Sequence, residues 1–73
     1  MTKEELNNKL IEVANKSEQK VLKQRDYLER RGIKWQESDL FKYYVAELFG
    51  VIECLKAVEI DIAEYEWVYK YSL

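Results

Sequence analysis

The sequence predicts an all-α protein, an antiparallel hairpin of two long helices over about residues 3–31 and 39–70, in a single domain of residues 1–73. Two observations predict this fold. The chain has no proline and two glycines, and helix formers such as Ala, Leu, Glu and Lys are common. Its second half also carries a heptad seam, whose residues share one stripe of a helix: Phe41, Tyr44, Leu48, Val51, Leu55, Val58, Ile62, Tyr65 and Tyr69.

The first predicted helix has both a start signal and a stop signal. Thr2 and Glu5 have the spacing of a capping box, in which each side chain satisfies a free backbone N–H group of the first turn. Gly32 suits the left-handed residue that ends a helix, and Ile33 can then contact Leu28. The apolar residues between these signals recur at helical spacing: Leu6, Leu10, Val13, Ala14, Val21 and Leu28.

The second predicted helix follows a short connection over residues 32–38. Ser38 is a good N-cap, so we expect Asp39 to be the first helical residue. Gly50 costs about 1 kcal/mol in a helix interior. The heptad register nevertheless continues through Gly50 without a slip, which predicts one helix to about residue 70.

The tail, residues 65–73, has two interpretations. Its aromatic residues alternate with a period of two, which fits a strand that would pair with residues 33–35. The preferred interpretation is the end of the second helix, fraying near residue 70. This interpretation places Trp35 at the end of the hairpin far from the tail.

The second helix is apolar over a wider arc than one neighbouring helix can cover. Further apolar residues beside the seam widen the arc to roughly 200°. We therefore expect a second copy to cover the remainder and to form a homodimeric four-helix bundle. The predicted self-association residues are Phe49, Ile52, Ile60, Ala63 and Trp67. A strip of small residues either admits another helix or is plain surface: Ala46, Gly50, Cys54 and Ala57.

The net charge of −2 hides an uneven distribution. Residues 1–31 hold eight Lys/Arg and six Asp/Glu, whereas residues 39–73 hold three and seven. These opposite balances favour side-by-side pairing of the two halves. One flank of the first helix carries a basic stripe that can bind nucleic-acid phosphates or pair with acidic helix flanks: Lys9, Lys16, Lys20, Lys23 and Arg30.

The sequence argues against enzymatic chemistry. It has no histidine to serve as a general base or zinc ligand, so we expect no catalytic, cofactor-binding or metal-binding residue and no small-molecule substrate. The lone cysteine, Cys54, is interpreted as a buried small apolar residue. No secretory signal or membrane-spanning run is recognisable, so we expect a cytoplasmic protein with no membrane partner.

The leading functional hypothesis is a small non-enzymatic regulatory factor. It would self-associate through its helices, bind an unidentified protein and occlude that protein's surface. Trp35, Trp67 and Tyr71 are the candidate partner-binding residues, because tryptophan and tyrosine dominate binding hot spots. The alternatives are a nucleic-acid-binding hairpin dimer that uses the basic stripe and a structural assembly subunit. The composition has the style of a bacterial or phage accessory protein.

Overall fold

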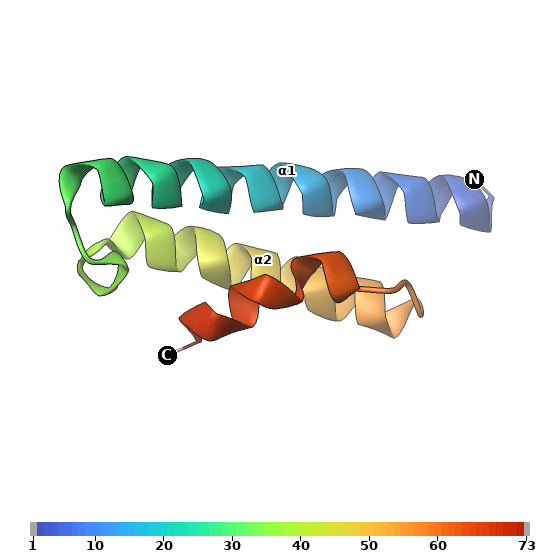
Figure 1. Ribbon diagram of the computed structural model, residues 1–73. Helices are drawn as coiled ribbons and strands as arrows, with labels where there is room; N and C mark the ends of the chain where they lie inside the picture. The colour runs from blue at the N-terminus through green and yellow to red at the C-terminus, as the bar shows by residue number, and fades with distance from the viewer. Residues whose placement is uncertain (1, 73) are drawn as a thin grey trace.

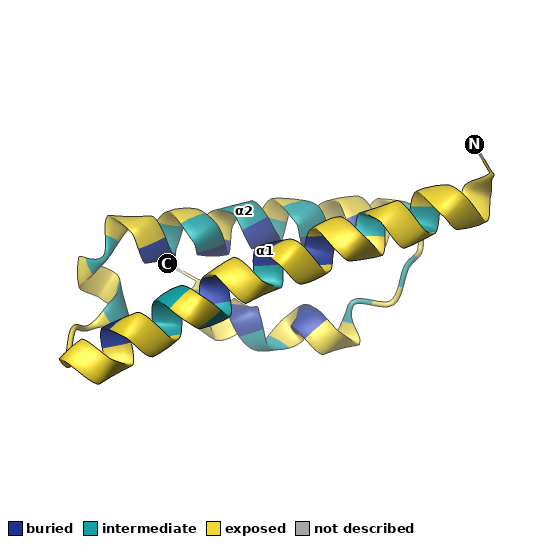
Figure 2. Ribbon diagram, turned by 90° about the horizontal axis from the view of Figure 1, so that it is seen from above, coloured by how far each residue is buried: buried dark blue, intermediate teal, exposed yellow. Residues whose placement is uncertain are grey.

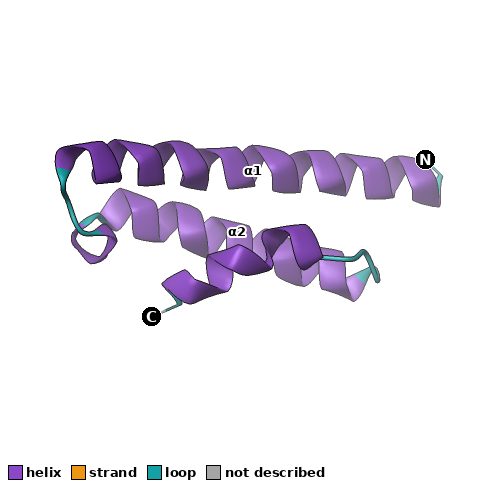
Figure 3. Ribbon diagram, viewed as in Figure 1, coloured by secondary structure: helices purple, strands orange, loops and turns teal. Residues whose placement is uncertain are grey.

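The chain folds into helices only, as the computed structural model shows for residues 2–72. The elements are α1 (Lys3–Arg31), η1 (Trp35–Glu37), α2 (Asp39–Ala57) and η2 (Ala63–Tyr71), where η denotes a 3₁₀ helix. The long helices α1 and α2 lie side by side and antiparallel (Figure 1). No strand occurs among these residues (Figure 3). The predicted all-α class and the pairing of two long helices are confirmed.

Helix α1 begins and ends where its sequence signals predict. The Thr2 Oγ1 accepts a hydrogen bond from the Glu5 backbone N–H at 3.1 Å. At the other end Gly32 has a φ of 67°, and the Ile33 N–H donates to the Leu28 carbonyl at 3.0 Å. This is the Schellman arrangement, which satisfies carbonyl groups that the last helical turn leaves free.

Helix α2 begins as predicted and ends earlier. The Ser38 Oγ accepts from the Phe41 N–H at 3.1 Å, and the helix passes through Gly50 without interruption. It stops at Ala57, so the predicted continuous helix over residues 39–70 is wrong.

A second Schellman arrangement causes this early stop. The Ile60 N–H donates to the Leu55 carbonyl at 2.9 Å, and the Glu59 N–H donates to the Lys56 carbonyl at 3.1 Å. Glu59 takes the left-handed conformation, with a φ of 62°. Because glutamate rather than glycine occupies this position, the sequence carries no ordinary stop signal there.

The tail forms η2, which turns back along the hairpin instead of extending it. A 3₁₀ helix has three residues per turn, so side chains three apart lie on one face. That face points inward: Tyr65 and Val68 are buried, and Ile62 and Tyr71 are half-buried. The strand interpretation of the tail is therefore also wrong, since its inward-facing residues follow a period of three.

The core lies between α1, α2 and η2. Figure 2, seen from above, shows α1 crossing over α2 and η2, with buried residues recurring along its length. Ser17 of α1 is buried as well. The buried apolar residues are Ala14, Val21, Leu28, Phe41, Val45, Leu48, Ile52, Leu55, Tyr65 and Val68.

The wide apolar arc of α2 is covered to a large extent by the chain itself. Val45 and Ile52, which lie beside the predicted seam, are buried, whereas Tyr44 and Val51 of the seam are half-buried. Because η2 packs on this flank of α2, a second copy is not needed to cover it. The width of the apolar arc correctly indicates that α2 packs against a second segment besides α1, and that segment is η2.

Candidate functional site

The three predicted partner-binding residues gather at the end of the molecule where α1 and α2 are connected. The ring centroids of Trp35 and Tyr71 lie 5.3 Å apart, edge to face, and those of Trp67 and Tyr71 lie 6.4 Å apart. Phe41 completes the cluster, 5.0 Å from Tyr71 and 6.1 Å from Trp35. The expected separation of Trp35 from the tail is wrong, because the early end of α2 lets η2 return to this end.

An open cleft of about 450 Å³ lies beside this cluster. The Arg25 guanidinium stands over the Trp67 ring, with its carbon 5.4 Å from the ring centroid. Ile33, on the connection, is 38% exposed and adds apolar surface. We call this feature the aromatic cleft, and its lining residues are Arg25, Leu28, Glu29, Ile33, Lys34, Trp35, Gln36 and Tyr71.

Two hydrogen bonds fasten η2 to α1. The Tyr65 hydroxyl donates to the Asn15 Oδ1 at 2.6 Å, and the Trp67 indole Nε1–H donates to the Glu18 Oε2 at 2.9 Å. Burial, and to a lesser extent the nearby carboxylates of Glu64 and Glu18, raise the pKa of Tyr65. Trp67 thus has a structural role, since it holds η2 in place.

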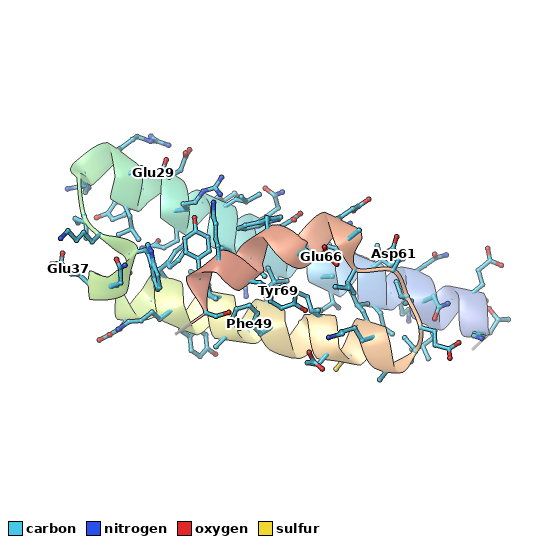
Figure 4. The ribbon with its side chains drawn as sticks, turned by 60° about the horizontal axis from the view of Figure 1, so that its bottom comes forward. Glu29, Glu37, Phe49, Asp61, Glu66 and Tyr69 are labelled. Atoms are coloured by element: carbon cyan, nitrogen blue, oxygen red, sulfur yellow. The ribbon has the colours of Figure 1, made fainter. Side chains whose placement is uncertain are left out.

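The predicted self-association residues mostly contact their own chain. Phe49 stacks on Tyr69 with ring centroids 5.7 Å apart (Figure 4). Ile52 is fully buried, and Ile60 packs half-buried against the core. Ala63 is exposed. Because Ile52 has no exposed surface and Trp67 contacts Glu18, the surface predicted for self-association does not form as one continuous patch.

A different surface remains uncovered, on the side of the α1–α2 pair away from η2. Asn15, Glu18 and Arg25 of α1 contact η2, whereas Lys20 lies on the other flank and pairs with Glu47 of α2 at 3.3 Å. By helical spacing, that other flank and the adjoining side of α2 carry five large apolar residues. Each is at least 43% exposed, and we call them the open face: Leu6, Val13, Tyr27, Leu40 and Tyr43.

A shallow groove of about 260 Å³ runs along the open face between α1 and α2. Its base includes Ser17, whose hydroxyl is buried and has no hydrogen-bond partner among the described residues. The groove is lined by Val13, Lys16, Ser17, Lys20, Glu47 and Val51. This surface was not predicted from the sequence, although α2 and its C-cap carry a second set of residues at alternating steps of four and three: Leu40, Tyr44, Glu47, Val51, Cys54 and Val58.

The basic stripe lies beside the open face and is exposed along its length. Lys16 pairs with Glu12 at 3.3 Å, Lys20 with Glu47, and Arg30 with Asp26 at 3.2 Å. The Lys20 Nζ also stands 5.8 Å from the Tyr44 ring centroid. Three of the five cations therefore already have carboxylate neighbours within the chain.

Cys54 is exposed, so its interpretation as a buried apolar residue is wrong. Cys54 lies on the outer side of α2, away from Ile52 and Leu55, which are fully buried in the same helical turn. Between residues 2 and 72 there is no group of three or more His, Cys, Asp or Glu side chains placed to hold a metal ion. Neither long helix in that range offers an apolar stretch sufficient to cross a lipid bilayer.

In comparisons with protein-family models, curated proteins and solved structures, no match to this chain is found.

Proposed function

We propose that the chain is a non-enzymatic protein-binding factor whose aromatic cleft engages a partner protein and covers part of its surface. The convergence of Trp35, Trp67 and Tyr71 beside the cleft carries this proposal. Aromatic side chains bury a large area with few rotatable bonds, and arginine is the other residue enriched in binding hot spots. The cleft brings Arg25 together with this aromatic cluster.

The proposal includes a homodimer, in which the open faces of two copies pack into a four-helix bundle. Charge complementarity supports it. The α1 edge of the open face is basic, with Lys9, Lys16, Lys23 and Arg30 spaced by sevens, whereas the α2 side of that face carries the carboxylate of Glu47. A two-fold axis that lays α1 of one copy on α2 of the other brings these edges together. The exposed apolar residues then form the centre of the interface.

Light scattering coupled to size-exclusion chromatography tests the dimer with a matched pair of variants. Val13 is 50% exposed on the open face, and Ile11 is 37% exposed on the opposite flank of α1. We expect wild type and Ile11→Glu to have the mass of two chains and Val13→Glu that of one, because a buried, unpaired carboxylate opposes association. A wild-type chain that is monomeric at micromolar concentration would contradict the dimer, and a larger mass would support an assembly subunit.

Affinity capture from cells that make the protein tests partner binding, with Ile33 as the site to change. Ile33 and Ile11 are almost equally exposed, at 38% and 37%, but only Ile33 lines the aromatic cleft. We expect wild type and Ile11→Glu to capture the same protein and Ile33→Glu to lose it. If Ile33→Glu captures that protein as well as wild type does, the cleft is not the binding site.

Nucleic-acid binding is a second candidate function, and it would use the open face. The observation that favours it is the exposed Tyr27, which lines a surface hollow together with Arg30 of the basic stripe, since bases stack on aromatic rings while cations contact phosphates. Titration with mixed RNA and DNA across a salt series tests it. If no salt-sensitive complex forms at low ionic strength, this candidate is excluded.

An intracellular location belongs to the proposal. The exposed Cys54 thiol supports it, because reducing compartments keep such a thiol free.

A further inference from the structure

We infer that the aromatic cleft selects a segment of the partner protein in which a carboxylate side chain adjoins a large apolar side chain. The inference rests on the proposed protein-binding function and adds the chemistry of the segment that is bound. It follows from three features of the cleft: the guanidinium of Arg25, the second cation Lys34, and a wall of apolar side chains.

Arg25 is held in a position suited to a carboxylate. Its guanidinium carbon lies over the Trp67 ring, 5.4 Å from the ring centroid, so the aromatic ring covers one side of the group. Trp67 is itself fixed by its 2.9 Å hydrogen bond to Glu18. A guanidinium that stacks on a ring keeps its N–H groups at the edge, where they can donate two parallel hydrogen bonds to a carboxylate.

The one carboxylate paired with Arg25, that of Glu29, leaves most of the guanidinium N–H groups without a hydrogen-bond acceptor among residues 2–72. Glu29 Oε1 lies 4.0 Å from the Arg25 Nε, beyond hydrogen-bonding distance, and the Glu29 side chain is 69% exposed. An exposed ion pair of this kind contributes little free energy. A carboxylate from a bound segment can therefore replace Glu29 or add to it at the other guanidinium nitrogens.

Charge in the cleft also favours an acidic segment. Among the lining residues Arg25 and Lys34 are basic and Glu29 alone is acidic, although the whole chain has a net charge of −2. Arg25 precedes Leu28 and Ile33 in the sequence, and Lys34 follows them on the connection between α1 and α2. The cleft is thus locally positive, although the whole molecule is acidic. This positive charge disfavours the binding of a basic segment.

The rest of the cleft is an apolar wall. Trp35 and Tyr71 meet edge to face at 5.3 Å and stay half-buried, so each keeps surface that a ligand can cover. Leu28 and Ile33 extend the wall. Because the volume of about 450 Å³ fits one or two large side chains, the cleft accommodates an apolar side chain next to the carboxylate that Arg25 binds.

Two blocked peptides that differ in one group test the inference. The probes are acetyl-Leu-Glu-Phe-Leu-amide and acetyl-Leu-Gln-Phe-Leu-amide, which have nearly the same shape and no tryptophan. The readouts on the full-length protein are tryptophan fluorescence and the NMR shifts of the two indole N–H groups and the Arg25 side chain. We expect the glutamate peptide to bind about tenfold more tightly, because charge-assisted hydrogen bonds are stronger than neutral ones.

Variants assign the preference to Arg25. In Arg25→Gln we expect the two peptides to bind equally, whereas Arg30→Gln should keep the preference, since Arg30 pairs with Asp26 and does not line the cleft. Lys34→Gln, on the exposed connection, should reduce the preference without affecting folding. Thermal unfolding of each variant confirms that it is folded.

The outcomes separate this inference from the proposed function. If both peptides bind wild type equally at the cleft, the carboxylate preference is wrong and the protein-binding function stands. If Arg25→Gln and Arg30→Gln lower the preference by the same factor, the assignment to Arg25 is wrong. If neither peptide perturbs the indole signals of Trp35 and Trp67, both the inference and the use of the cleft for binding are overturned.

Discussion

The two sides of α2 are built from similar residues and end in different environments. On the covered side Val45, Ile52 and Phe49 pack against α1 and η2. On the open side Leu40 and Tyr43 are 48% and 63% exposed. An amphipathic pattern therefore predicts that a helix surface needs a neighbour, but it does not predict whether that neighbour comes from the same chain. Here the same chain covers one side and leaves the other exposed.

The largest expected difference between the two sides is in the free energy of unfolding. Ile52→Ala should destabilise the chain by about 2–5 kcal/mol, because it leaves a cavity at a fully buried position. Tyr43→Ala should change this free energy by less than about 0.5 kcal/mol, since Tyr43 is exposed. Urea unfolding at a concentration where the chain is monomeric measures both. Equal losses would mean that Tyr43 is buried in the monomer.

A smaller effect is expected from the hydrogen bond that holds η2 on the covered side. Tyr65→Phe removes the hydroxyl that donates to Asn15 at 2.6 Å, and we expect a loss of about 0.5–1.5 kcal/mol at neutral pH. Tyr69→Phe is the matched control, because Tyr69 is also on η2 but is 38% exposed, and the partner of its hydroxyl is the solvent-exposed Lys56 side chain. Chemical unfolding of the two variants should give unequal losses.

The pH dependence of Tyr65 sharpens this test. Its pKa in the folded state lies above the ordinary value of 10.0, chiefly because burial disfavours the phenolate. The hydroxyl's contribution to stability is therefore complete below about pH 10 and is lost as the pH rises through the raised pKa. The gap in stability between wild type and Tyr65→Phe should stay constant up to about pH 10 and narrow above that pH. A gap that stays constant would show that Tyr65 does not titrate differently in the two states.

The smallest expected effects concern the two turns that end α1 and α2. Gly32→Ala should destabilise the chain by about 1 kcal/mol, because its φ of 67° strains a residue with a Cβ. Glu59→Gly should stabilise it by about 0.5 kcal/mol, since relief of the same strain is partly offset by the greater entropy of glycine in the unfolded chain. Thermal unfolding of the two variants shows whether each substitution stabilises or destabilises the chain. A destabilised Glu59→Gly would mean that the glutamate side chain itself holds the turn.

The sequence predicts those elements whose signals are local. Thr2 and Ser38 cap their helices as expected, and Gly32 ends α1, because each signal acts within a few residues of its own position. The end of α2 could not be predicted in this way, since Glu59 takes a conformation that glutamate seldom adopts. One signal in the tail was present and was not used, namely the period of three in Ile62, Tyr65, Val68 and Tyr71.

The candidate site could be predicted as residue types and not as an arrangement. Tryptophan and tyrosine suggest binding wherever they occur, so Trp35, Trp67 and Tyr71 could be selected from the sequence alone. Their proximity depends on the reversal of the chain over residues 58–62, which follows from the turn at Glu59. Arg25 was missed for the same reason, because its position over Trp67 exists only once η2 has turned back.

The reach of η2 back to α1 has a consequence for the order of folding. The bonds from Tyr65 to Asn15 and from Trp67 to Glu18 join residues 50 and 49 positions apart, so they close large loops at a substantial cost in entropy. We expect α1 and α2 to pair first and η2 to dock last, and its amide protons to exchange with solvent sooner than those of α2. While η2 is undocked, Phe49 lacks its Tyr69 neighbour, so we expect the chain to be more prone to aggregation before η2 docks than after it.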